Sequence, residues 1–150
     1  AVDLVELVEN VVAAHSLPAR AKLMHTELTL QARRCLAEPA LLISVMDNLY
    51  SNAVHYGAES GNIRIHSYRH GEQVRIDVAN SGEQIPAAEK NMIFEPFYQW
   101  SHQLKGAVKG SGLGLSIARD CVRQMQGELS LVDAPAGQVC FRITLPSAPE

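Results

Sequence analysis

Three glycines stand at alternate positions just before a pattern that is typical of a helix: Gly110, Gly112 and Gly114. Because glycine has no Cβ, the backbone can turn sharply there and bring its amides close to a ligand. The first amides of a helix lack internal acceptors and lie at the positive end of the helix dipole. The segment therefore predicts a phosphate-binding site. The alternative is a loop that only connects two elements, since so short a motif also occurs by chance.

A second polar group lies on a helix expected from 38–39 to 57. Asn48, Asn52 and His55 recur at steps of four and three, which places them on one face of that helix. Asparagine is a mediocre helix former, so two of them at this spacing need an explanation. An amide oxygen is a hard ligand for Mg²⁺, whose octahedron is completed by phosphates and water. Asn52 is the candidate ligand; on this helix alone, solvent-facing polar residues are the alternative.

The elements that must position these groups follow from the spacing of apolar residues. Helices are expected at 2–14, from 38–39 to 57 and from 113 onward, and strands at 26–30, 62–68, 73–79, 128–132 and 138–145. Residues 16–18, which include Pro18, should stop the first helix after residue 14. Residues 69–72 should form a hairpin turn, and residues 80–109 should form a long loop. The buried helix faces are expected to hold Leu42, Val45, Met46, Leu49 and Ala53, and Leu113, Ile117, Ala118, Cys121, Val122 and Met125.

This order of elements predicts the fold class. Helices interleaved with mostly antiparallel strands favour an α+β fold, a two-layer sandwich in which helices cover one face of a single sheet. A chain of 150 residues can build one proper core and is too short for two domains of usual size. Residues 1–150 are therefore expected to form one domain.

The composition excludes several classes of protein. With 47% apolar and 19% charged residues the chain resembles ordinary globular proteins, and its net charge of -3 provides no basic surface for nucleic acid or membranes. Cys35, Cys121 and Cys140 form no Cys-x-x-Cys pair, which favours reduced packing residues in a reducing compartment. The chain has no apolar run of membrane-spanning length and starts without Met, so we expect a cytosolic piece of a longer protein.

Four segments, taken in order, resemble the ATP-binding boxes of two-component sensor histidine kinases. They are 48–56 (NLYSNAVHY), 80–86 (NSGEQIP), 94–97 (FEPF) and 110–114 (GSGLG). These kinases belong to the GHKL superfamily, whose ATP-binding domains have the Bergerat fold. Four ordered motifs that span nearly the whole chain are far more specific than any single glycine pattern.

The resemblance implies a role for each matching residue. Asn52 matches the Mg²⁺-binding asparagine, and Asn48 lies one helical turn earlier in the same catalytic box. Tyr56 matches an aromatic residue beside the adenine, and His55 stands where a lysine or arginine usually contacts phosphate; a surface histidine is the alternative. The other residues expected to bind nucleotide are Asn80, Gly82, Ile85, Phe94, Phe97, Lys109, Gly110, Gly112, Leu113, Gly114 and Leu115, with a lid at 99–109.

Two further positions, besides His55, depart from the family pattern. Asn80 stands in place of the aspartate that accepts a hydrogen bond from the adenine amino group. Its amide oxygen can accept the same bond, but it carries no charge and must be oriented correctly. Gln84 stands at the second glycine position of that box, which should make the turn less permissive.

The resemblance also implies a function. The expected domain binds ATP and Mg²⁺ and donates the γ-phosphate to a histidine on a separate dimerisation and phosphoacceptor domain, with a response regulator as a further partner. Hydrolytic relatives carry a glutamate where this chain has Asn48, which cannot take a proton, so transfer is favoured over hydrolysis. None of the six histidines lies in the family's phosphoacceptor motif, so the chain alone should not phosphorylate itself.

The resemblance also implies an oligomeric state and a cellular location, and two alternative functions remain open. The isolated domain should be a monomer, and the longer kinase a homodimer anchored in the inner membrane with this domain in the cytoplasm. One alternative is a degenerate nucleotide-binding module that regulates a partner by docking. Another is a serine kinase of the anti-sigma-factor type, which shares the fold.

Overall fold

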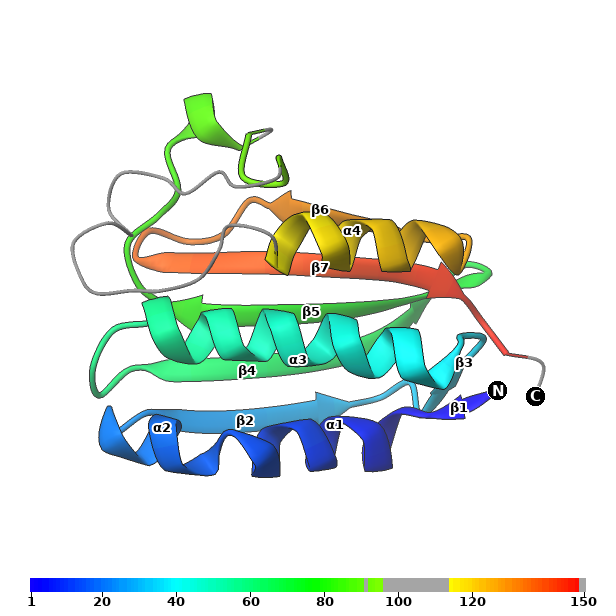
Figure 1. The fold of residues 1–150 in the computed structure, drawn as a ribbon, viewed down its shortest axis with the longest axis horizontal. Coiled ribbons are helices and arrows are strands. Elements are labelled where there is room, and N and C mark those ends of the chain that lie inside the picture. The colour runs from blue at the N-terminus through cyan, green and yellow to red at the C-terminus, as the bar shows by residue number, and fades with distance from the viewer. Residues whose placement is uncertain (91, 96–113, 149–150) are drawn as a thin grey trace.

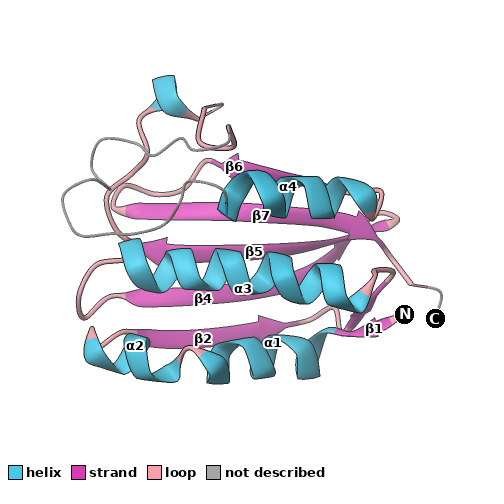
Figure 2. Ribbon diagram, viewed as in Figure 1, coloured by secondary structure: helices cyan, strands magenta, loops and turns pink. Residues whose placement is uncertain are grey.

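The computed structural model describes residues 1–90, 92–95 and 114–148. One layer of helices lies in front of one sheet (Figures 1 and 2). The sheet has five strands in the order β2-β4-β5-β7-β6. They are β2 (His25–Leu30), β4 (Asn62–His70), β5 (Gln73–Ser81), β6 (Glu128–Val132) and β7 (Gln138–Pro146). β2 and β4 are parallel and the other neighbours are antiparallel, so the predicted mixed, mostly antiparallel α+β sandwich is confirmed.

The helices all lie on the same face of the sheet (Figure 1). They are α1 (Leu4–Ala14), α2 (Ser16–Ala21), α3 (Pro39–Tyr56) and α4 (Gly114–Gln124), with a 3-10 turn, η1, at Ala87–Glu89. α3 packs on β5, and α4 packs on α3, β6 and β7. Within the described ranges, no helix combines the length and the apolar character needed to cross a bilayer.

The N-terminal region differs from its prediction in two ways. Residues Val2–Asp3 form a short strand, β1, that pairs antiparallel with β3 (Arg34–Cys35). The first helix therefore begins at Leu4, where the Asp3 side chain caps it by accepting from the amides of Val5 and Glu6. Pro18 does not simply end this helix. It lies in the first turn of α2, where a missing N–H costs nothing, so a second helix follows at once.

α3 has the predicted bounds. The Glu38 side chain caps it by accepting from the Ala40 amide at 2.8 Å, and Pro39 occupies its first turn. The helix ends at Tyr56, before Gly57. Gly57 has an ordinary φ of -71°, so left-handed backbone is not the reason for glycine there. A Cβ at this position would stand 2.5 Å from both the Ala53 carbonyl oxygen and the Met24 Cε atom.

The β4–β5 hairpin is tighter than predicted. The strands extend to His70 and from Gln73, so the turn contains only Gly71 and Glu72. Gly71 has a φ of +64°, which suits glycine. At its other end β5 continues to Ser81, so Asn80 belongs to a strand and not to the predicted loop.

The core lies between the helices and the sheet. The predicted buried face of α3 is confirmed, with Tyr50 and Val54 added to it. On α4 one prediction is wrong: Ile117 is 45% exposed, whereas Ala118, Cys121 and Val122, and Met125 just after the helix, are buried. The buried stripe is centred near Ala118, and Ile117 lies about 100° away from Ala118 around the helix, toward solvent. Cys35 and Cys121 are buried, Cys140 is partly buried, and all are free thiols.

Candidate functional site

A hollow lies where α3 faces the ends of β5 and β7 and the beginning of α4. It holds about 420 Å³ of empty space, including the part open to solvent. Four of the predicted site residues contribute to its lining: Asn52, Tyr56, Asn80 and Leu115. The other lining residues are Leu49, Ala53, Val78, Glu83, Val139 and Phe141. We call this space the α3 hollow.

Asn48 and Asn52 occupy successive turns of α3 and are both partly buried. Asn52 lines the α3 hollow. Asn48 faces the first residue of α4: a Cβ built on Gly114 would stand 3.2 Å from Asn48 Oδ1. That is closer than most Cβ contacts, so glycine leaves the room that this amide occupies. The predicted metal-binding turn of α3 and the beginning of α4 therefore lie against each other.

Asn80 is only 8% exposed, and its side-chain amide has a defined orientation. Nδ2 donates to the Ser81 carbonyl oxygen at 2.9 Å, and the same oxygen accepts from the Ala58 amide at 2.9 Å. With Nδ2 engaged, Oδ1 is the branch that remains to accept a bond. The bond to the Ser81 carbonyl oxygen thus holds the Asn80 amide in the orientation that presents an acceptor, as the aspartate of the family pattern would.

Gly82 forms the next part of this wall. A Cβ at Gly82 would stand 3.0 Å from Asn80 Nδ2 and 3.3 Å from the Tyr56 carbonyl oxygen. The backbone at Gly82 therefore lies against both residues, and a larger residue would push them. Its amide donates to the Gly137 carbonyl oxygen at 2.9 Å, which ties this point to the beginning of β7.

Tyr56 and His55 end α3 side by side. Tyr56 lines the α3 hollow, and burial raises the pKa of its phenol, so the hydroxyl stays protonated at neutral pH. The His55 ring meets the Tyr56 ring edge-on, with centroids 4.5 Å apart. His55 itself is exposed and does not belong to the lining of the α3 hollow.

The segment after Gly82 is attached to the β6–β7 turn. Gln84 Nε2 donates to the carbonyl oxygens of Ala134 and Pro135, at 3.1 and 3.4 Å. Gln84 is not among the described residues with positive φ, so the predicted conflict between a side chain and this turn does not arise. Ile85 is buried and lines a neighbouring cleft with Gln84, outside the α3 hollow.

Phe94 is buried behind the α3 hollow. Its ring meets the Phe141 ring edge-on at 6.1 Å, and the Arg119 guanidinium carbon lies 4.6 Å from the Phe94 ring centre. Phe141 lines the α3 hollow, so Phe94 packs against the lining from outside and does not itself contribute to it. The remaining predicted site residues lie outside the described residues: Phe97, Lys109, Gly110, Gly112 and Leu113, together with the lid at 99–109.

The donor groups around the hollow suit a hard cation shared with phosphates. Within the part of the chain that the structure describes, no three His, Cys, Asp or Glu side chains gather to hold a metal ion. The amide oxygens of Asn48 and Asn52 on α3 are hard ligands, and Mg²⁺ needs few protein oxygens when phosphates supply the rest. At Gly82 and Gly114 the space that a Cβ would need is taken by Asn80, Tyr56 and Asn48, so glycine lets these groups pack against the main chain.

Sequence reasoning missed the floor of the hollow. Val78, Val139 and Phe141 come from β5 and β7, and nothing in their residue types marks them as ligand contacts. Strand alternation could have placed their side chains on the helix-facing side. Only the pairing of β5 with β7 brings Val78 opposite Phe141.

Comparison with known proteins agrees with this geometry. Residues 37–149 match the family described as histidine kinase-, DNA gyrase B- and HSP90-like ATPase. The chain is 70% identical over 147 residues to the sensor histidine kinase GlrK of Escherichia coli K12. That match covers 98% of this chain and 31% of GlrK, so the chain spans about a third of its curated relative.

Solved structures of histidine kinases have the same fold as this chain. The nucleotide-free catalytic domain of histidine kinase ThkA is 29% identical, with a TM-score of 0.82, and the match covers 99% of this chain and 97% of that one. ThkA has also been solved in complex with the response regulator TrrA, with a TM-score of 0.79, 28% identity and coverage of 99% and 41%. Full-length ShkA, solved with AMPPNP, gives a TM-score of 0.84 at 25% identity, with coverage of 99% and 31%. This chain belongs to the histidine kinase-, DNA gyrase B- and HSP90-like ATPase family and has the fold of a histidine kinase catalytic domain.

Proposed function

We propose that this chain binds ATP with Mg²⁺ in the α3 hollow and donates the γ-phosphate to a histidine of a dimerisation and phosphoacceptor domain. The observation that carries the proposal is the juxtaposition of Asn52 and the oriented amide of Asn80 in one hollow. ShkA, of the same fold, was solved with AMPPNP, an ATP analogue, which supports the choice of ligand.

The Asn80 end of the hollow suits the adenine base. The 6-amino group of adenine is a donor, and Asn80 Oδ1 is an acceptor whose partner amide group already bonds to Ser81. Apolar side chains provide flat contact area for the ring: Leu49, Ala53, Val78, Val139 and Phe141. Tyr56 adds an aromatic face that remains uncharged.

The Asn52 end suits the phosphates and their metal. Asn52 would hold Mg²⁺ through its amide oxygen, with Asn48 one turn earlier beside the beginning of α4. Bound Mg²⁺ neutralises charge on the phosphates. The first amides of α4 lie at the positive end of its dipole, which favours an anion there. Lys109, Gly110, Gly112 and Leu113 are proposed to complete this cradle, and His55 to approach it from the end of α3.

The residues around the phosphate end favour transfer over hydrolysis. An amide at Asn48 cannot remove a proton from water. The carboxylate in the lining, Glu83, follows Gly82 at the Asn80 end of the hollow and not on α3. The site therefore positions the triphosphate and neutralises its charge until a separate nucleophile arrives.

The partners follow from the relatives. ThkA was solved with a response regulator, and GlrK is a sensor histidine kinase, so we propose a response regulator and a phosphoacceptor domain as the partners of this chain. The longer protein would be a homodimeric sensor in the inner membrane, with this domain in the cytoplasm. Nucleic acid is not a proposed partner, because the net charge is -3.

Calorimetric titration with AMPPNP, with and without Mg²⁺, tests nucleotide binding. The wild-type chain should bind, and Asn52→Ala should abolish the Mg²⁺-dependent part of the affinity. Asn10→Ala, an exposed asparagine on α1, is the matched control and should bind like wild type. A folded chain that does not bind at all would favour the docking module.

Phosphoryl transfer is tested by mixing the chain with labelled ATP and the remaining part of GlrK. Label should appear there as phosphohistidine, which is labile in acid. Acid-stable label on serine would instead favour the serine kinase, and no label on the chain alone is expected.

A further inference from the structure

Lys22, which follows α2, directs its ammonium group at the C-terminal end of α3. Nζ donates to the carbonyl oxygens of Val54, His55 and Gly57, at 2.8, 2.9 and 2.7 Å. An ammonium group has three donors and no acceptor, so its whole capacity is used on the end of one helix. Lys22 also accepts at its own carbonyl oxygen from the Ser60 amide at 2.8 Å.

The three bonds from Lys22 satisfy carbonyl groups at the C-terminal end of α3. The last carbonyl groups of a helix lack intrahelical donors and carry the negative end of its dipole, so a cation there is favourable. Burial lowers the pKa of Lys22, and the nearby charge of Glu59 acts in the opposite direction. The ammonium group is thus partly withdrawn from water, and the three carbonyl oxygens replace that water.

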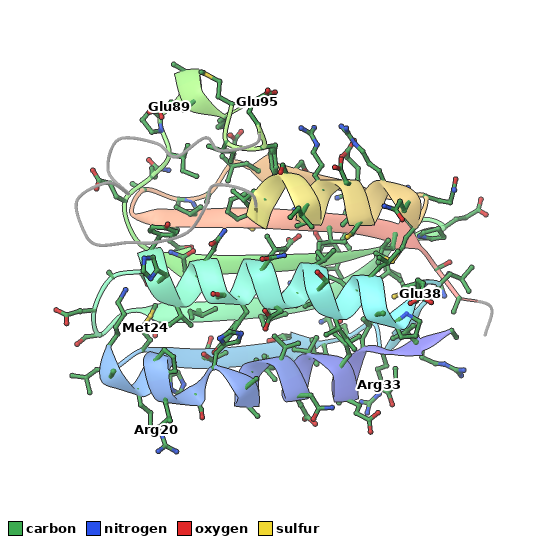
Figure 3. All side chains as sticks on the ribbon, viewed as in Figure 1. Arg20, Met24, Arg33, Glu38, Glu89 and Glu95 are labelled. Carbon is green, nitrogen blue, oxygen red and sulfur yellow. The ribbon has the colours of Figure 1, made fainter. Side chains whose placement is uncertain are left out.

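The carbonyls that Lys22 binds lie on either side of Tyr56, which lines the α3 hollow. One residue further on, the Ala58 amide donates to the Ser81 carbonyl oxygen, the same oxygen that orients Asn80. The segment after Lys22 packs on this turn as well, because the Met24 methyl group lies close to Gly57. In Figure 3 Met24 lies between the ends of α2 and α3, whereas Arg20 points away from both.

We propose that Lys22 is a positioning residue for nucleotide binding: it fixes the last turn of α3, and through Tyr56 and Ala58 it holds the adenine end of the α3 hollow in its receptive geometry. This inference rests on the proposed function of the hollow. Lys22 itself lies outside the lining of the α3 hollow.

The first test compares AMPPNP affinities by calorimetry. Lys22→Met keeps the apolar stem and removes all three donors, and it should weaken binding by on the order of ten-fold, a common size for coupling between linked sites. Arg20→Met removes a neighbouring exposed cation and should bind like wild type. Ser67→Ala removes a buried bond to the Ala32 carbonyl oxygen near the hairpin end of β4, and it should lower stability without changing affinity. If Lys22→Met binds like wild type, the inference is wrong.

A second test needs no variant and therefore holds even if Lys22→Met does not fold. Because coupling between sites is reciprocal, AMPPNP binding to the wild-type chain should shift the ¹⁵N and ¹H resonances of the Lys22 ammonium group and slow hydrogen exchange of the Ala58 amide. Unchanged signals from both groups, while nucleotide is bound, would overturn the inference. Failure of the wild-type chain to bind AMPPNP would overturn the proposed function instead, so the two failures can be told apart.

Discussion

The side-chain amide of Asn80 donates from Nδ2 to the Ser81 carbonyl oxygen at 2.9 Å, in a position where only 8% of Asn80 is exposed. This bond decides which end of the amide a ligand meets. The family aspartate presents acceptors whichever way it turns, whereas an asparagine presents a donor or an acceptor according to its orientation. We therefore expect the backbone around Ser81 to contribute to the nucleotide specificity of this chain.

The first prediction concerns the choice of base. Since Oδ1 of Asn80 accepts, AMPPNP should bind more tightly than GMPPNP by about 1–3 kcal/mol, the cost of an unsatisfied buried polar group. Asn80→Asp should keep this preference, and Asn80→Ala should weaken AMPPNP and remove most of the preference. Calorimetric titration of each variant with both nucleotides measures this, and equal affinities in the wild-type chain would contradict it.

Gly114→Ala should weaken AMPPNP binding without lowering the stability of the fold. The new Cβ would stand 3.2 Å from Asn48 Oδ1 and must displace that side chain, so AMPPNP affinity should fall several-fold. Stability should stay constant or rise by up to about 1 kcal/mol, because alanine is the better helix former.

Gly71→Ala is the control for that substitution, because it should change stability and not AMPPNP affinity. Its φ is +64° and its surroundings are open, so alanine should cost about 1–2 kcal/mol through the backbone alone and leave affinity unchanged. Thermal unfolding and titration of both variants measure the two effects. A loss of both properties in Gly114→Ala would contradict the proposed reason for glycine there.

Asp77→Asn should destabilise the chain without affecting nucleotide binding. Asp77 accepts from Arg142 Nε at 2.9 Å and Nη2 at 3.1 Å, and from the Tyr68 hydroxyl at 3.1 Å. Its neighbours Ile76 and Val78 are buried, so strand alternation puts Asp77 on the face of the sheet away from the helices. Loss of this charged acceptor should cost about 1–3 kcal/mol in urea unfolding. Asp133→Asn breaks an exposed pair with Lys90 and should change stability little.

The cysteines predict a decline of stability at high pH. Desolvation raises the pKa of Cys35 and of Cys140 from 9.0 to about 11. Between these values the folded chain holds protons that the unfolded chain releases, so the free energy of unfolding should fall as pH rises from about 9 to 11. Urea unfolding at several pH values measures this slope. The double variant Cys35→Ala, Cys140→Ala should show a shallower decline, and an identical slope would contradict the assignment to these thiols.

The nature and the approximate bounds of most elements could be predicted from the sequence, because the direction of a side chain within a helix or strand is a local property. The first-turn proline at Pro39, the glycine at Gly57 and the apolar spacing along α3 predict that helix almost to the residue. The four motifs are likewise short segments whose order along the chain is visible without coordinates, and they indicated the family.

Only the tertiary structure decided which of these local features meet. Strand order places Val78 and Phe141 beneath α3, and packing against α3, β6 and β7 turns Ile117 outward. The ammonium group of Lys22 reaches carbonyls more than thirty residues away in sequence. Such contacts depend on how separate elements pair and pack, and no periodicity within one element encodes them. The sequence by itself thus determined the family, most of the elements and the expected ligand, whereas the packing of α3 against β5 and the contact of Lys22 with the end of α3 decided the shape of the hollow in which we propose that this ligand binds.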